Sequence, residues 1–176
     1  EWLGELVRGT DSSLLDEWER LQNPESVEAA ASGHPESHGD GVAAITTNRR
    51  AFRVLVRNAL FRRVELASRE RWGELAALGD LDADGVAWDS DRWRDALDPY
   101  FDEHADIGTG PDARGPALLQ VTEKPATGGV GERWEVRQVL DDPAGDHDWR
   151  IDAVVDLAAS DEQGEVHLVV TAAGRL

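Results

Sequence analysis

Two stretches decide the fold of this 176-residue chain: RWEVRQVL at residues 133–140 and WRIDAVVDL at residues 149–157. Polar and apolar side chains alternate along both, which is the pattern of a β-strand with one buried and one solvated face. The alternation places Trp134 and Val136 on the apolar side of the first strand, and Ile151 and Val155 on that of the second. We therefore predict two neighbouring strands that face the same core.

Two further strands are predicted on either side of this pair, at residues 117–123 and 165–171. The connections are short and rich in Gly, Pro and Asp, which favours an antiparallel meander of four strands. Burial of each large apolar side chain contributes about 1.5–3 kcal/mol, so the apolar sides of these strands would carry much of the stability.

Helices are predicted before the strands. Apolar residues at helical spacing indicate one long amphipathic helix from Thr47 to about Leu78, with a possible break near Gly73, whose apolar stripe includes Leu55 and Leu78. A second runs from about Asp91 to His104, and Pro99 could kink or divide it. Helices followed by a curved antiparallel sheet make the fold class α+β.

The domain organisation follows from local composition. Residues 1–22 read as a helical N-terminal arm that ends an upstream region, and residues 23–45, rich in Gly, Ser, Pro and His, as a flexible linker. Residues 46–176 form the α+β domain. The chain does not begin with Met, so we expect it to be part of a longer protein.

Composition narrows the possible functions. The chain has 36 acidic and 18 basic side chains, a formal charge of −18, and no cysteine. Without cysteine there is no disulfide framework and no thiolate metal site. Such an acidic chain repels a phosphate backbone on average, so we expect weak or no direct binding of nucleic acid. No apolar stretch is long enough for a membrane span, and we expect a cytoplasmic protein without membrane contact.

The polar side of the predicted sheet carries a possible site. If the turns are short, Arg137 lies opposite Asp152, and Arg133, Asp156 and His167 form a row across three strands. One interpretation is charge pairing on a wetted surface, worth about 0.2–1 kcal/mol for each pair. The other is a polar pocket on the concave side of a curled sheet, where ligand sites often form.

Residues 80–91, DLDADGVAWDSD, match the template of a calcium-binding loop. The ligands would be Asp80, Asp82, Asp84 and Asp91. The last position has Asp in place of the usual Glu, and an ordinary turn between two helices explains the same residues. No phosphate-binding loop and no zinc-protease or serine-hydrolase motif occurs, so we predict no catalytic residue and no cofactor in this chain.

Several strings resemble the end of a family of actinobacterial DEAD/DEAH-box helicases. They are DSSLLDEWE at residues 11–19, PDARGP at 111–116, WEVRQVLDDP at 134–143, HDW at 147–149 and DLAASD at 156–161. The likeness covers nearly the whole chain. It implies a C-terminal domain of unknown function behind an ATPase core, with ATP binding, ATP hydrolysis and nucleic-acid binding in the missing part of the parent protein. The helices and sheet also look like the cone-shaped NTF2-like fold, a likeness that implies no function.

The resemblance leads to a first hypothesis: a non-catalytic accessory domain of a helicase, for partner docking, dimerisation or positioning of the nucleic acid. Its partners would be the helicase core of the same chain, another protein or a second copy. The alternatives are an NTF2-like small-molecule binder or enzyme, with Arg133, Asp156 and His167 as candidates, and a single-loop calcium-binding module.

Overall fold

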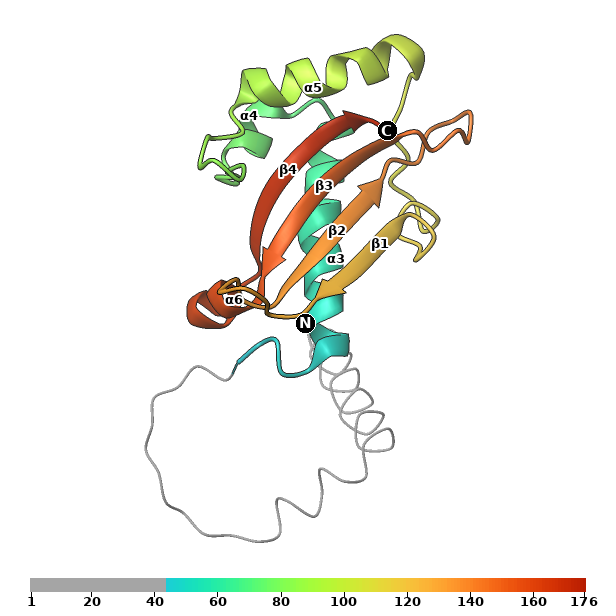
Figure 1. Ribbon diagram of the computed structural model, residues 1–176. Helices are drawn as coiled ribbons and strands as arrows, with labels where there is room; N and C mark the ends of the chain where they lie inside the picture. The colour runs from blue at the N-terminus through green and yellow to red at the C-terminus, as the bar shows by residue number, and fades with distance from the viewer. Residues whose placement is uncertain (1–43) are drawn as a thin grey trace, which may run out of the picture. The chain divides into compact units, whose positions relative to one another are not determined.

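The computed structural model describes residues 44–176 (Figure 1). The chain separates into two units, Glu1–Asp40 and Gly41–Leu176, and the description below concerns the second. The predicted arm at residues 1–22 and nearly all of the predicted linker at residues 23–45 lie outside the described residues.

The helices of the described part are α3 (Arg49–Ala67), α4 (Trp72–Ala76), α5 (Ser90–Glu103) and α6 (Leu157–Gln163). Side-chain caps define the N-termini of α3, α5 and α6, because a free backbone N–H of the first turn finds a side-chain acceptor there. Asn48 accepts from the backbone N–H of Ala51 at the start of α3, and Asp89 accepts from that of Arg92 at the start of α5. Pro99 lies inside α5 without dividing it.

The long helix predicted from Thr47 to Leu78, with a possible break near Gly73, is broken. It is two helices, and the break lies between Ala67 and Trp72, before the predicted position near Gly73. The Ser68 hydroxyl donates to the carbonyl of Glu65, and Glu70 adopts a left-handed conformation with φ of 51°. Local side-chain bonding of this kind competes with the helical ladder, and a left-handed residue cannot continue it.

Four strands form one antiparallel sheet in the order β1-β2-β3-β4: β1 (Leu119–Lys124), β2 (Arg133–Val139), β3 (Trp149–Asp156) and β4 (His167–Arg175). The predicted meander and the α+β class are confirmed. The connection between β3 and β4 was predicted as a turn and is instead helix α6, which ends at the left-handed Gly164. A helix end of this kind favours glycine because a left-handed backbone conformation costs it little.

The core lies between one face of the sheet and the helices. Trp134 and Ile151 are fully buried on this face, as the alternation predicts, and the Trp134 ring meets Phe52 of α3 edge-on with centroids 5.0 Å apart. Two residues of the predicted helical stripe are not in the core, since Leu55 is 44% exposed and Leu78 is 40% exposed. In its first half α3 buries only a narrow strip, and Leu78 comes after the end of α4.

Figure 1 shows how the helices surround the sheet. Helix α3 runs along one face, α4 and α5 group at the end of the sheet where β2 and β4 finish, and α6 lies at the opposite end. The other face of the sheet, turned toward the viewer, carries no helix of the described part. In residues 44–176, no helix has the length and apolar character needed to cross a membrane.

Candidate functional site

The open face of the sheet is hollowed at its centre. The hollow has a volume of about 480 Å³ and draws side chains from all four strands. Its lining residues are Gln120, Thr122, Glu135, Val136, Arg137, Asp152, Ala153, Val154 and Thr171. A curved antiparallel sheet with one solvated face can offer such a concave surface, and the size lies in the range of small-ligand sites.

Strand register brings the polar side chains of the hollow together. Arg137 of β2 is paired with Gln120 of β1 on one side and with Asp152 of β3 on the other. The pairing of β3 with β4 slips by one residue after Asp152, which leaves Thr171 as the extra residue of a β-bulge. A bulge bends its strand and re-aims the side chains next to it, so the irregularity helps to shape this surface.

A three-residue ion cluster reaches the hollow, because two of its members, Arg137 and Asp152, line it. Arg137 holds Asp152 in a bidentate pair, with Nε 2.7 Å from Oδ1 and Nη2 3.1 Å from Oδ2, and Arg150 Nε lies 2.8 Å from Oδ2. Burial raises the pKa of Asp152, but the hydrogen bonds from Arg137 and Arg150 outweigh burial and hold it below the ordinary value. The Asp152 carboxylate likewise raises the pKa of Arg137. The cluster presents a fixed array of charges and donors to any ligand in the hollow.

The predicted row of Arg133, Asp156 and His167 exists, but it does not line the hollow. The register pairs Arg133 with Asp156 and Asp156 with His167, as the short turns predicted. The Asp156 side chain caps α6 by accepting from the backbone N–H of Ala159. The His167 ring Nδ1 lies 3.3 Å from Oε1 of Gln163, also in α6. Of the five predicted pocket residues, Arg137 and Asp152 line the hollow, while Asp156 and His167 contact α6 and Arg133 is paired with Asp156 in the sheet.

The first carboxylates of the predicted calcium loop have arginine partners. Asp80 is 4% exposed, and it accepts from Nε of Arg63 at 2.8 Å and from Nη2 at 2.5 Å. Asp82 accepts from Arg92 at 2.8 Å and from the backbone N–H of Val86 at 2.9 Å. The bond from Val86 and the one from Arg92 hold the pKa of Asp82 below its ordinary value.

The rest of this loop serves the fold. Asp84 is exposed, and Asp91 faces solvent in an ion pair with Arg94 at 3.0 Å. The segment also covers the free edge of β4, where the carbonyl of Leu81 accepts from the N–H of Val170 and Trp88 Nε1 donates to the Val170 carbonyl. Edge strands need such cover because their unpaired backbone groups attract other chains. Calcium binding at Asp80, Asp82, Asp84 and Asp91 stays a prediction.

Several arginines of residues 49–71 contact carboxylates. Glu65 and Glu74 belong to the helices themselves, Glu123 to β1, and Glu132 to the connection between β1 and β2. The pairs on this surface are Arg49–Glu132 at 2.6 Å, Arg53–Glu123 at 2.9 Å, Arg62–Glu65 at 3.8 Å and Arg71–Glu74 at 2.7 Å. These contacts lower the positive charge that this side of the domain could offer to a phosphate backbone.

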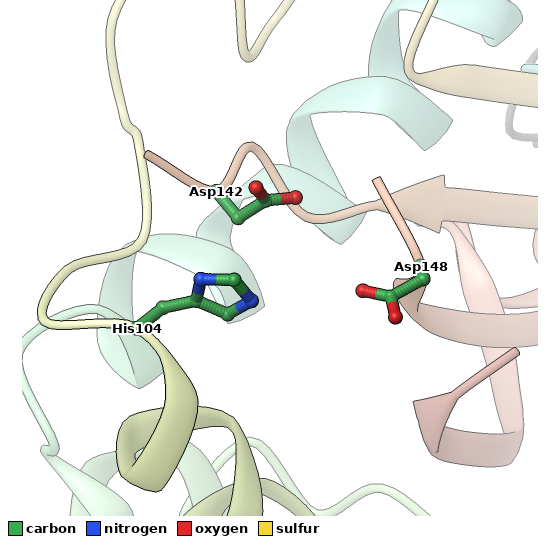
Figure 2. Close-up of side chains that lie close together, drawn as sticks. All are labelled: His104, Asp142 and Asp148. Atoms are coloured by element: carbon green, nitrogen blue, oxygen red, sulfur yellow. The ribbon is translucent and has the colours of Figure 1, made fainter. Parts of the chain in front are cut away.

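A second cluster lies where the C-terminal end of α5 meets the connection between β2 and β3 (Figure 2). His104 follows the last residue of α5, Asp142 follows β2, and Asp148 precedes β3. One ligand atom from each lies within 4.8 Å of the other two, and within residues 44–176 this is the one such group of three histidine or carboxylate side chains. Sequence reasoning missed it, since His104 is 38 residues from Asp142 along the chain and no local motif joins them.

Each member of this cluster is held by its surroundings. Asp142 is 5% exposed and accepts from the backbone N–H groups of Asp146 at 3.0 Å and His147 at 2.7 Å. Burial raises its pKa, but these hydrogen bonds and the nearby His104 outweigh burial and leave the pKa below the ordinary value. Asp148 Oδ2 pairs with Arg175 at 2.7 Å. Histidine nitrogen and carboxylate oxygen are both common metal ligands.

The comparisons with known proteins identify a family but no function. Neither a curated protein nor a solved structure matches the chain. A family model covers residues 1–173, and the chain therefore belongs to the family described as Domain of unknown function (DUF3516).

Proposed function

We propose that this chain is the non-catalytic, C-terminal accessory domain of a DEAD/DEAH-box helicase, and that it binds a protein partner through the open face of its sheet. The resemblance of strings at residues 111–116, 134–143 and 156–161 to the ends of such helicases supports the parent protein. The observation that carries the binding surface is the hollow of about 480 Å³ around Arg137 and Asp152.

The contrast between the faces supports docking on the open one. The other face is closed by α3 and packed with large side chains such as Trp134 and Ile151, which are fully buried. On the open face, Arg137, Arg150 and Asp152 are held in one ion cluster. Groups fixed in this way lose little conformational freedom on binding, which favours recognition of a partner with complementary hydrogen-bonding groups.

Protein is favoured over nucleic acid as the partner on electrostatic grounds. The formal charge is −18, and Arg49, Arg53, Arg62 and Arg71 have carboxylate partners. Nucleic-acid affinity depends on basic side chains that neutralise phosphates. In this proposal the partner is the helicase core of the same polypeptide, and ATP and nucleic-acid chemistry belong to that core.

A small-molecule binder is the second candidate, and the size of the hollow favours it. About 480 Å³ lies within the range of about 300–1,000 Å³ that ligand sites occupy. As part of this second candidate function, we propose that the helices and the curved sheet form an NTF2-like cone. A ligand for this surface needs a group that accepts hydrogen bonds from Arg137 and donors for the oxygens of Glu135.

The parent protein can be tested on the gene itself. We expect the reading frame upstream of Glu1 to encode a G-x-x-x-x-G-K-[ST] phosphate loop, because a helicase core needs one to bind ATP. A reading frame that lacks this loop contradicts the helicase assignment.

The binding surface can be tested by filling the hollow. Thr171 is exposed and lines it, so Thr171→Arg places a long charged side chain in the proposed contact. Thr109→Arg makes the same change at an exposed loop position outside the lining and serves as the control. Calorimetric titration of the separately expressed helicase core should show binding to the wild type and to Thr109→Arg, and at least about tenfold weaker binding to Thr171→Arg. Equal binding by both variants excludes this face as the docking site.

The small-molecule candidate and the calcium prediction have their own measurements. If the hollow binds a small ligand, a thermal-shift screen of metabolite-sized compounds should find one that raises the Tm of the wild type. The same compound should leave the Tm of Thr171→Arg unchanged. Calorimetry with millimolar Ca²⁺ tests residues 80–91, and a heat of binding that Asp84→Asn abolishes would support the calcium loop.

A further inference from the structure

We propose that His104, Asp142 and Asp148 bind a divalent transition-metal ion, with Zn²⁺ as the best-matched probe. The three side chains face a common space, with the imidazole on one side and the two carboxylates on the other two (Figure 2). This site is separate from the hollow on the open face, and it does not depend on the proposed docking function.

Two buried atoms without partners point to a ligand. His104 Nε2 and Asp148 Oδ1 are both buried, and neither has a hydrogen-bond partner among residues 44–176. A buried polar atom that makes no hydrogen bond costs about 1–3 kcal/mol, so such atoms are rare and call for a missing partner. Here two of them belong to side chains that face each other across the same space (Figure 2).

The spacing fits a bridging ion better than direct contact. The ligand atoms lie within 4.8 Å of one another, and no ion pair within 4.0 Å joins His104 to either aspartate in the described contacts. A metal with bonds of about 2.0–2.2 Å to nitrogen and oxygen brings its ligands to roughly 3–4 Å from each other. A small inward movement of the three side chains therefore completes the site.

The surroundings provide the support that metal ligands need. The N–H groups of Asp146 and His147 hold the Asp142 carboxylate, and Arg175 holds the distal oxygen of Asp148. The Tyr100 ring packs against the imidazole with centroids 4.9 Å apart. Such contacts orient first-sphere ligands, and their loss commonly weakens metal binding by about 10–100-fold.

The ligand set selects the class of metal. Two carboxylates neutralise the charge of a divalent ion, and an imidazole nitrogen favours Zn²⁺ over Ca²⁺ and Mg²⁺, which prefer oxygen ligands only. The three residues give fewer ligands than a closed tetrahedral site has, so water completes the coordination. Bound metal ties the end of α5 to the connection between β2 and β3, and it stabilises the fold by binding only the folded state.

The test is a Zn²⁺ titration of the complete chain. His34 and His38 are close to each other in the sequence and could bind Zn²⁺ themselves. Both are replaced by Gln in every variant, so that they contribute no heat of binding. We expect one Zn²⁺ per chain by calorimetry and a rise in Tm of about 5–10 °C at a concentration about 100-fold above Kd. His104→Gln and Asp148→Asn should each weaken binding by about 100-fold or more. Asp142 is left unchanged because it also holds the backbone of its turn.

Matched controls come from outside the cluster and the turn that supports it. Asp98→Asn, at an exposed position, and His167→Gln, beside Gln163 of α6, make the same chemical changes at residues that are not in the cluster, and both should bind Zn²⁺ as the parent does. Far-UV circular dichroism of the metal-free proteins shows whether each variant is folded. No binding by the folded parent, tighter binding of Ca²⁺ or Mg²⁺ than of Zn²⁺, or equal losses in the control and cluster variants would each overturn the proposal. If Asp148→Asn does not fold, His104→Gln alone decides.

Discussion

The two faces of the sheet are built from alternate residues of the same strands, yet they differ in almost every physical respect. On the face covered by helices, Trp134, Ile151 and Val155 are fully buried. On the open face, Arg137 of β2 and Asp152 of β3 are next in sequence to buried residues of the same strands. They form an ion pair that lines the hollow. The comparison separates two tasks: the first face supplies most of the stability, and the second is available for recognition.

The largest expected effect is on the covered face. Trp134→Ala should lower the free energy of unfolding by about 3–5 kcal/mol, because it leaves a cavity beside Phe52. Thr122→Ala on the open face, where Thr122 is exposed, should change it by no more than about 0.5 kcal/mol. Urea unfolding followed by circular dichroism measures both. Similar losses for the two variants would mean that the division between the faces is wrong.

The buried ion pair Arg63–Asp80 gives the next effect. Its side chains are 10% and 3% exposed, so Arg63→Met leaves a carboxylate buried without its partner and should cost about 3 kcal/mol. The double variant Arg63→Met/Asp80→Leu should recover most of this loss, because a buried pair replaced by apolar side chains is often neutral. A double variant less stable than Arg63→Met would show that the pair itself stabilises the core.

The pH dependence of the free energy of unfolding tests the titrating groups of the hollow and of the second cluster, namely Asp152, Asp142 and the neighbouring Tyr100. The pKa values of Asp142 and Asp152 are lowered in the folded chain, so their stabilisation is present above the unfolded value of about 4 and is lost as the pH falls through the folded values. Burial and the nearby carboxylates Asp142, Asp141 and Asp106 raise the pKa of Tyr100. Its contribution is therefore present below about pH 10, the unfolded value, and is lost above it. Urea midpoints measured from pH 3 to pH 11 should fall at both ends, and constant midpoints below pH 4 would contradict the carboxylate assignment.

The ion cluster of the open face should have a smaller effect than the buried pair. Asp152→Asn removes the charge that accepts from Arg137 and Arg150, and we expect a loss of about 1–2 kcal/mol at neutral pH. The acid limb of the stability curve should also become shallower. Glu135→Gln is the control on the same face, since its pair with Lys124 at 3.3 Å is exposed and should be worth less than about 0.5 kcal/mol.

Much of the sheet could be predicted from the sequence, because alternation along a strand reports directly which side is buried. Short turns then set the register, and the pairing of Arg137 with Asp152 follows. Helix α6 could not be found in this way, since its seven residues carry no apolar period of their own and depend on the cap from Asp156. The burial of Arg63 was also hidden, because its neighbours in sequence include several exposed arginines and only the fold brings Asp80 beneath it.

The two candidate sites show the same limit. The charged centre of the hollow was predicted, since it depends on register alone, but its extent also depends on the bulge at Thr171, which shifts β4 relative to β3. The cluster of His104, Asp142 and Asp148 depends on where α5 ends relative to the connection between β2 and β3. Distances between elements of this kind come from packing, and no spacing along the chain encodes them.

The smallest expected effects on stability concern Asp156. They show whether its side chain caps α6 or belongs to the recognition surface. It belongs to the predicted pocket row, but its carboxylate accepts from the N–H of Ala159 at 3.0 Å and caps α6. Asp156→Ala should therefore cost about 1 kcal/mol, while Asp156→Asn, which keeps an acceptor oxygen, should cost only a few tenths. Neither change should alter binding at the hollow, because Asp156 does not line it. Calorimetric titration with the helicase core checks the second point. If Asp156→Asn retains its stability and loses binding, the recognition surface reaches beyond the hollow to the row that Asp156 forms with Arg133 and His167.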